Sequence, residues 1–221
     1  MMDGPLGEAE HHAALAGLER LNVLAFSVRP FWQEIRPLAA ASPRPLRVVD
    51  VACGGGGLVA GLRRAAHRAG ISLEVDGCDR SPTAVAFAEA RAPHYPKATG
   101  RFFVQDILAE GVPAGYDVVV NSLFLHHLSE ADATAFLADA AAKATRLLLL
   151  SDILRTRLGW WMVRLACTTL GGSRVVVEDG QTSLRAAFTP AELQTLAHSA
   201  GLLHASFRRH WPERALISLS K

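Results

Sequence analysis

Short apolar segments and segments with helical spacing alternate along residues 46–152. The apolar segments, each a candidate strand, are LRVVDVA from residue 46, LEVDGCD from 73, GRFFVQD from 100, DVVVNS from 117 and RLLLLSD from 146. Strands that are apolar along their whole length are typical of a parallel sheet buried on both faces. The alternation therefore predicts a doubly wound α/β fold with a mostly parallel sheet.

The flanking segments are expected to complete a single domain over residues 1–221. Residues 1–41 carry leucines at helical spacing, interrupted at Pro30, and predict a helical N-terminal lid. Residues 153–187 are rich in Trp, Leu and Gly and read as an insertion that packs over a site. Residues 188–221 predict a helix with a capping box, followed by an antiparallel strand pair that makes the sheet seven-stranded.

Composition excludes several classes of protein. The chain is 50% hydrophobic, has a formal net charge of +2 and scatters its arginines, so no nucleic-acid-binding surface is expected. Its three cysteines form no CxxC pair, which argues against a zinc site or a disulfide framework and favours a cytoplasmic location. No uninterrupted apolar run reaches the length of a membrane span, so stable membrane insertion is not expected. We expect no metal.

The stretch VVDVACGGGG, residues 48–57, places four glycines after the first strand. Glycine costs backbone entropy, but it lets the backbone approach a ligand closely and directs helix N–H groups at it. The spacing Gly55-x-Gly57-x-x-Ala60, with Asp79 further on, also fits a dinucleotide site. Asp50 separates the two alternatives, because a carboxylate there repels a pyrophosphate but accepts hydrogen bonds from a cationic amino acid. S-adenosylmethionine (SAM) is such a ligand.

VVDVACGGG resembles the first motif of class I SAM-dependent methyltransferases, with Ala52 in place of the usual first glycine, as in relatives of ubiquinone and menaquinone biosynthesis methyltransferases. VDGCDRSP resembles the second motif, which implies that Asp79 binds the ribose hydroxyls. FVQDIL resembles the third, which implies that Asp106 holds the adenine amino group and Ile107 covers the ring. DVVVNSLFLHHLSE resembles the fourth. The resemblance implies a Rossmann-like fold, residues 46–152 as the cofactor-binding core, and a cofactor site made of Asp50, Ala52, Gly54, Gly56, Asp79, Arg80, Asp106, Ile107, Asn121 and Ser122.

Methyl transfer to a hydroxyl needs a base to remove the proton. His126 and His127 follow the fourth strand at the edge where ligands bind in this architecture, and Asp152 ends the strand expected beside it. The Asp152 carboxylate is therefore expected to orient one imidazole, with His127 slightly favoured as the base. The alternative interpretation is that one histidine only satisfies backbone groups of the loop.

The acceptor pocket is expected to come from residues 1–41 and 153–187. Aromatic and apolar side chains there predict a cavity for a flat or lipidic small molecule: Phe26, Phe31, Trp32, Trp160, Trp161 and Met162. The second segment also resembles that of methyltransferases encoded beside type III polyketide synthases, which implies a phenolic or polyketide acceptor, O-methylation and a role in secondary metabolism. An alternative interpretation of the same segment is contact with a membrane surface.

Three other functions are left open. C-methylation of a quinol-like ring needs the same base as O-methylation. A non-catalytic cofactor-binding protein would keep the acidic residues without using the histidines. An NAD-linked oxidoreductase shares the glycine loop, but neither Tyr95 nor Tyr116 begins a Tyr-x-x-x-Lys pattern. A homodimer is also left open.

Overall fold

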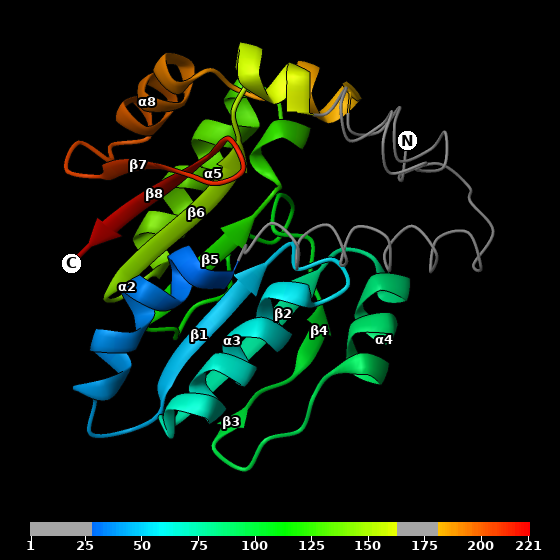
Figure 1. Cartoon of the computed structure of the whole chain (residues 1–221), viewed down its shortest axis with the longest axis vertical. Coiled ribbons are helices and arrows are strands. Elements are labelled where there is room, and N and C mark those ends of the chain that lie inside the picture. The colour runs from blue at the N-terminus through cyan, green and yellow to red at the C-terminus, as the bar shows by residue number, and fades with distance from the viewer. Residues whose placement is uncertain (1–27, 163–180) are drawn as a thin grey trace.

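The structure, a computed structural model, describes residues 28–162 and 181–221 (Figure 1). A single sheet forms its centre, with the strand order β3-β2-β1-β5-β6-β8-β7 and with β4 beside β2. The strands are β1 Leu46–Val51, β2 Leu73–Asp79, β3 Ala98–Thr99, β4 Phe102–Val104, β5 Val118–Ser122, β6 Leu147–Ile153, β7 Ser206–His210 and β8 Arg214–Ser220.

The chain builds the sheet outward in two directions from its first strand. β1 pairs in parallel with β2 on one side and with β5 on the other, and β6 follows β5 in parallel. Only β8 runs against its neighbours, pairing antiparallel with β6 and with β7. The predicted doubly wound sheet with an antiparallel C-terminal pair is confirmed.

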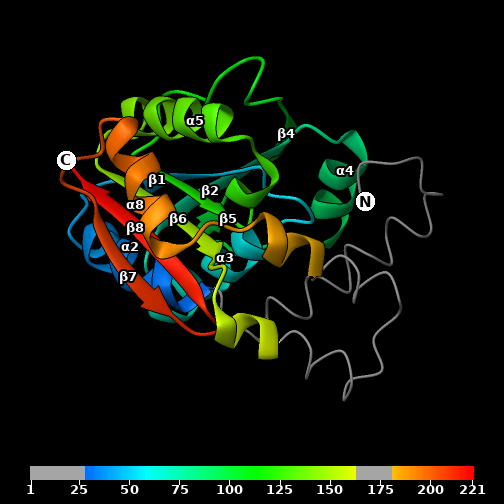
Figure 2. The same cartoon turned by 90° about the horizontal axis from the view of Figure 1, so that it is seen from above.

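Helices cover both faces of the sheet (Figure 2). The first face is packed by α2 Val28–Ala40, α3 Gly57–Ala69 and α4 Pro82–Arg91. The opposite face is packed by α5 Glu130–Lys143 and α8 Pro190–Ser199. Among the described residues, no helix is long and apolar enough to span a bilayer.

The central strands explain why both faces need a cover. In β5, Val118 and Val120 join the core beneath α2 and α3, while Val119 between them joins the core beneath α5. Since successive side chains of a strand point to opposite faces of the sheet, a strand made only of apolar residues must be covered on both faces. The sequence pattern thus dictates the three-layered arrangement.

The helix ends follow their capping residues. The Ser81 hydroxyl accepts a hydrogen bond from the backbone N–H of Ala84 at the start of α4. Thr189 and Glu192 form the expected capping box at the start of α8. Gly70 ends α3 in the left-handed conformation, with φ 68°. The capping box predicted within residues 188–221 is confirmed.

The strand expected from residue 100 is present but shorter, as β4 Phe102–Val104. An additional two-residue strand, β3, precedes it, so the sheet contains eight strands where seven were expected. Between β3 and β4, the backbone N–H of Arg101 donates to the Asp76 carboxylate, 2.9 Å away. Pro30 lies in the first turn of α2, where a backbone N–H has no intrahelical acceptor. The rest of the expected lid, residues 1–27, lies outside the described residues.

Candidate active site

The carboxyl ends of β1, β5 and β6 lie side by side at one edge of the sheet (Figure 1). The chain leaves β1 in one direction and β5 in the other, so this edge contains the topological switch point at which α/β sheets bind ligands. Most of the polar residues singled out in the sequence lie at these strand ends.

The loop after β1 takes its shape from left-handed residues. Ala52, Gly54 and Gly56 have φ angles of 55°, 52° and 75°. A methyl group on Gly56 would lie 2.8 Å from the Phe102 ring and 2.9 Å from the Ala88 side chain, whereas none of the described atoms lies within 4 Å of such a group on Gly54. Packing therefore requires Gly56 to be glycine, while Gly54 borders open space that a ligand can fill.

Asp50 is a buried acid at the end of β1. The residue is paired with Gly77 of β2 and with Val120 of β5, and it is only 2% exposed. Burial, assisted by the nearby Asp79 carboxylate, raises the pKa of Asp50 well above its ordinary value. A cationic group beside it would favour the ionised form, so this carboxyl is suited to an ammonium ligand.

Asp79 connects the end of β2 to the glycine loop. Its carboxylate accepts the backbone N–H of Gly54 at 2.8 Å through Oδ2 and that of Ser81 at 2.9 Å through Oδ1. Each carboxylate oxygen can accept a second hydrogen bond, so these contacts leave capacity for two hydroxyl groups. Arg80, the next residue, is exposed.

Asp106 caps a turn and Ile107 belongs to the core. Asp106 Oδ1 accepts the backbone N–H groups of Leu108 and Ala109 at 3.0 and 3.4 Å. The side chain of Ile107 is 8% exposed and joins the core beneath α5. Asp106 therefore caps a turn, and the binding of adenine by this pair stays a prediction.

Asn121 carries a polar atom that its surroundings leave without a hydrogen bond. This fully buried residue of β5 donates from Nδ2 to the backbone oxygen of Val51 at 2.6 Å. Its Oδ1 has no hydrogen-bond partner among the described residues. A buried polar atom of this kind is expensive unless a ligand or water satisfies it. Ser122, which follows it, is half-buried and is paired with Ser151 of β6.

Asp152 and His126 form the most tightly built pair at this edge. The carboxylate Oδ1 lies 2.7 Å from Nδ1 of the imidazole, and both side chains are buried. A carboxylate only accepts, so Nδ1 carries the proton and Nε2 retains its lone pair. The sequence predicted that Asp152 would orient one imidazole, and the structure brings it to His126.

His127 lies against this pair. Its ring centroid is 4.1 Å from that of His126, with the two planes tilted by 40°. His127 is the more exposed of the two histidines. The geometry favours His126 as the oriented imidazole, and a catalytic role for either histidine stays a prediction.

Ser151 and His210 form a second polar pair that sequence reasoning missed. Ser151 Oγ lies 2.9 Å from Nε2 of His210, whose Nδ1 is 3.0 Å from the backbone oxygen of Trp211. Burial lowers the pKa of His210, and Arg214 and Arg208 lower it further. No local motif marks this pair, because 59 positions separate its members and only the pairing of β6, β8 and β7 joins them.

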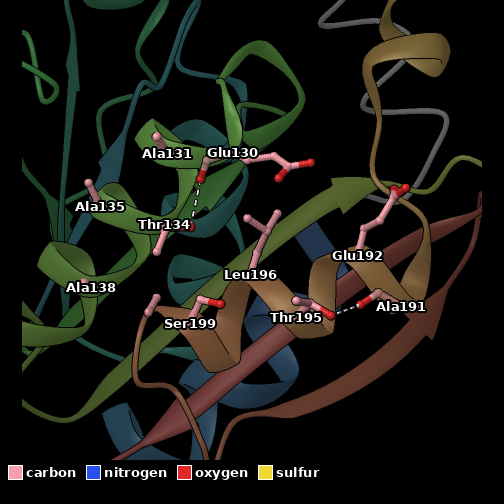
Figure 3. A pocket seen from close by; sticks show the side chains of 11 residues that line it. Glu130, Ala131, Thr134, Ala135, Ala138, Ala191, Glu192, Thr195, Leu196 and Ser199 are labelled. Carbon is pink, nitrogen blue, oxygen red and sulfur yellow. Dashed lines mark hydrogen bonds between the residues drawn. The ribbon is translucent and has the colours of Figure 1, made fainter.

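A surface cavity of about 730 Å³ lies elsewhere, between α5 and α8 (Figure 3). Small side chains such as Ala135 and Ala138 face Thr195 and Ser199 across it. None of the predicted site residues lines this cavity. We therefore assign the candidate site to the strand ends, where the buried polar groups lie. Within residues 28–162 and 181–221, no cluster of His, Cys, Asp or Glu could hold a metal ion.

The residues at the strand ends fit SAM. The buried Asp50 suits the ammonium group of an amino acid, Asp79 suits a pair of hydroxyls, and the space beside Gly54 admits a ligand against the backbone. Asn121 Oδ1 supplies a buried acceptor that lacks a partner. The aromatic residues expected to line the acceptor pocket differ in burial. Phe31 is fully buried in the core, whereas Trp160 and Trp161 are exposed. Phe26 lies outside the described residues.

Known proteins resemble this chain in sequence or in fold. Residues 48–145 match the family described as a methyltransferase domain. The fold is similar to that of magnesium protoporphyrin IX methyltransferase from Synechocystis PCC 6803 with bound S-adenosylhomocysteine (SAH), with a TM-score of 0.56 and 20% identity over 99% of this chain and 90% of the other. Human N-acetylserotonin methyltransferase in complex with SAM gives a TM-score of 0.64 and 17% identity over 97% of this chain and 56% of the other.

The mitomycin 7-O-methyltransferase MmcR is also similar, with a TM-score of 0.58 and 18% identity over 83% of this chain and 52% of the other. The chain thus spans about half the length of these last two proteins. No curated protein matches the sequence.

Residues 48–145 thus match a methyltransferase domain, and the fold of the chain is that of methyltransferases solved with bound SAM or SAH. The matched residues include the glycine loop and the ends of β1, β2 and β5 described above.

Proposed function

We propose that this enzyme methylates a hydroxyl group of a small apolar acceptor of the phenolic or polyketide class, with His126 as the base. The observation that carries the proposal is the buried His126–Asp152 pair at the end of β5 and β6. It lies next to the strand ends that carry Asp50 and Asn121, so a proton acceptor and the proposed cofactor residues share one sheet edge.

SAM supplies an electrophilic methyl group bound to a sulfonium. Asp152 accepts a hydrogen bond from Nδ1–H of the neutral His126 imidazole, so the Nε2 lone pair can take the proton of the acceptor hydroxyl. The new bond joins the hydroxyl oxygen to the methyl carbon, the sulfur–methyl bond breaks, and the proton resides on His126. The Asp152 carboxylate then stabilises the imidazolium, as in other carboxylate–histidine pairs.

The cofactor is proposed to lie along the ends of β2, β1 and β5. In this arrangement Asp79 binds the ribose hydroxyls, Asp50 faces the ammonium group, and Asn121 and Ser122 line the methyl end. Arg80, Asp106 and Ile107 are proposed to surround the nucleoside. Gly54 and Ala52 supply the close backbone, and Gly56 lets the loop pack on Phe102.

A histidine base serves O-methylation and C-methylation alike, so the preference for O-methylation rests on the comparisons. Two similar structures, the mitomycin 7-O-methyltransferase among them, are named for transfer to oxygen. We also propose a cytoplasmic location, which the free Cys53 and Cys78 support.

The test is a turnover assay with SAM labelled in its methyl group and a panel of phenols and hydroxylated alkylated rings. We expect a labelled product whose proton spectrum shows an O-methyl group, and loss of this product in the His126→Ala variant. A ring C-methyl product would replace the O-methylation proposal. SAH binding without turnover of any acceptor would indicate a non-catalytic cofactor-binding protein.

A further inference from the structure

A band of exposed aromatic and aliphatic side chains lies above the carboxyl end of β6. It comprises Leu158, Trp160 and Trp161 from the helical residues 157–162 and Trp211 from the turn between β7 and β8, and we call it the tryptophan rim. Their exposed fractions are 55%, 38%, 69% and 63%. Four of the seven large hydrophobic side chains that the described residues expose therefore gather here. We propose that the tryptophan rim binds the surface of an anionic lipid bilayer.

Hydrogen bonds link the two parts of the rim, residues 157–162 and the turn between β7 and β8. Thr156 donates from Oγ1 to the Glu213 carboxylate at 2.6 Å, and the backbone N–H of Leu154 donates to the Glu213 backbone oxygen at 2.9 Å. The same Thr156 hydroxyl accepts the backbone N–H of Gly159 at 3.0 Å and so caps the helical residues. Both views show residues 157–162 beside the β7–β8 turn (Figures 1 and 2). The rim is thus one surface although its members are far apart in sequence.

Positive charge surrounds the rim. Arg157 is exposed within it, and the guanidinium of Arg185 lies 5.8 Å from the centre of the Trp160 ring. The neighbouring acids Glu192 and Glu213 are each engaged by an arginine, at 2.6 and 2.8 Å. No ion pair between described residues includes Arg157 or Arg185. The described part of this surface therefore presents apolar rings together with two arginines that no described acid pairs with.

This combination matches an anionic bilayer better than a neutral surface. Trp prefers the boundary between headgroups and acyl chains, where its ring is buried and its N–H meets polar groups. Arginines add attraction to anionic headgroups, and exposed apolar side chains add burial. A surface contact of this kind needs no membrane-spanning helix.

The rim also lies where an apolar acceptor would enter. Residues 157–162 follow β6 directly, only a few positions after Asp152. An enzyme held on a bilayer by this rim would face acceptors dissolved in the lipid. Binding to the bilayer does not depend on the proposed methyl transfer, so the two proposals can fail separately.

Co-sedimentation of the full chain with vesicles tests the inference. We expect the protein to pellet with phosphatidylglycerol vesicles at low salt, to bind phosphatidylcholine vesicles more weakly, and to be released by added salt. The double variant Trp161→Ala/Trp211→Ala should lose at least about tenfold in affinity for the vesicles, since it removes two large apolar anchors. Arg157→Gln should weaken binding only to the anionic vesicles.

Leu203→Ala provides the matched control, because Leu203 is 66% exposed but lies outside the rim in the segment before β7. It should bind vesicles as the unmodified chain does. Equal affinity of every variant for SAH would show that all of them are folded. Absence of binding to anionic vesicles, or unchanged binding by the double variant, would overturn the proposal.

A second copy of the chain is the competing occupant of the rim. Analytical ultracentrifugation distinguishes it, because a subunit interface predicts a dimer that the double variant converts to a monomer. A dimer that dissociates in this way and does not bind vesicles would replace the bilayer proposal. A mass unchanged by the substitutions, together with vesicle binding, would support it.

Discussion

Asp152 holds His126 at two points, through the side chain and through the backbone. Oδ1 accepts from Nδ1 of the imidazole at 2.7 Å, while Oδ2 accepts the backbone N–H of the same residue at 3.1 Å. One carboxylate on β6 thus fixes both the ring and the short 3₁₀ turn, Leu125–His127, that carries it. A base held at two points keeps its lone pair in a constant direction, which is what positioned proton transfer requires.

Asp152→Asn should therefore lower turnover more than it lowers cofactor affinity. An amide can present its NH₂ group to Nδ1 and so favour the wrong tautomer, and loss of a positioned base typically costs about 10²–10⁴-fold in rate. The measurement is kcat together with SAH affinity by calorimetry. Asp139→Asn is the control, because that carboxylate also accepts a backbone N–H, from Val112 at 2.6 Å, but lies on α5 away from the site. Equal turnover in both variants would return His126 and Asp152 to a structural role.

Asp79→Ala should weaken SAH binding by about 100-fold, because two hydrogen bonds to an ionised group are lost. The variant also removes the contacts with Gly54 and Ser81, so affinity alone does not separate ribose binding from loop support. A 2′-deoxyribose analogue of SAH makes the distinction. The analogue should bind the unmodified protein less tightly than SAH does. The Asp79→Ala variant should bind the analogue and SAH equally tightly. A constant difference between the two ligands in both proteins would contradict the ribose assignment.

Asp50→Asn should stabilise the protein and weaken its cofactor binding. Because the folded-state pKa of Asp50 is raised, the unfolded chain loses this proton first as pH rises, and folding becomes less favourable above the ordinary pKa of about 3.9. Asn has no proton to lose, so the variant should have a higher free energy of unfolding than the unmodified protein at pH 7. This difference should vanish as the pH falls below about 4. Thermal unfolding at several pH values measures this. A variant that is less stable than the unmodified protein at pH 7 would contradict the burial argument.

Cofactor affinity should also depend on pH through Asp50. A cationic ligand favours the ionised carboxyl, so binding should release a proton and become tighter as the pH rises toward the raised pKa of the free protein. Calorimetry with SAM in two buffers of different ionisation enthalpy counts that proton. Asp50→Asn should abolish the proton release and weaken binding about tenfold or more. Proton release that persists in the variant would assign it to another group.

The glycine loop predicts opposite outcomes for two similar substitutions. Gly56→Ala should destabilise the fold by about 3 kcal/mol, because its methyl group meets Phe102 and Ala88 at a left-handed position. Gly54→Ala should cost only about 1 kcal/mol, from its backbone conformation alone, yet weaken SAH binding by filling the open space. Chemical denaturation and calorimetry measure the two effects. If Gly54→Ala binds SAH normally, the ligand does not approach the backbone there.

The sequence by itself determined the layered sheet, the caps and the candidate site edge. All-apolar strands must be buried on both faces. Ser81 and Thr189 begin their helices and Gly70 ends one, each through hydrogen bonds to near neighbours, so local chemistry suffices for the sheet layers and for the caps. The sequence also predicted that Asp50 and Asp152 lie at the same edge of the sheet, because the carboxyl ends of parallel strands meet there.

Only the tertiary structure decided relationships between distant residues. It selected His126 as the partner of Asp152, because the direction of a side chain in a turn depends on packing around it and not on its place in a motif. It assigned Gly56 to contact with Phe102 and Gly54 to open space, although the two positions look alike in sequence. It also joined Ser151 to His210, and Thr156 to Glu213, through strand pairings that no local pattern encodes. Such contacts depend on register across the sheet, which the folded chain fixes as a whole.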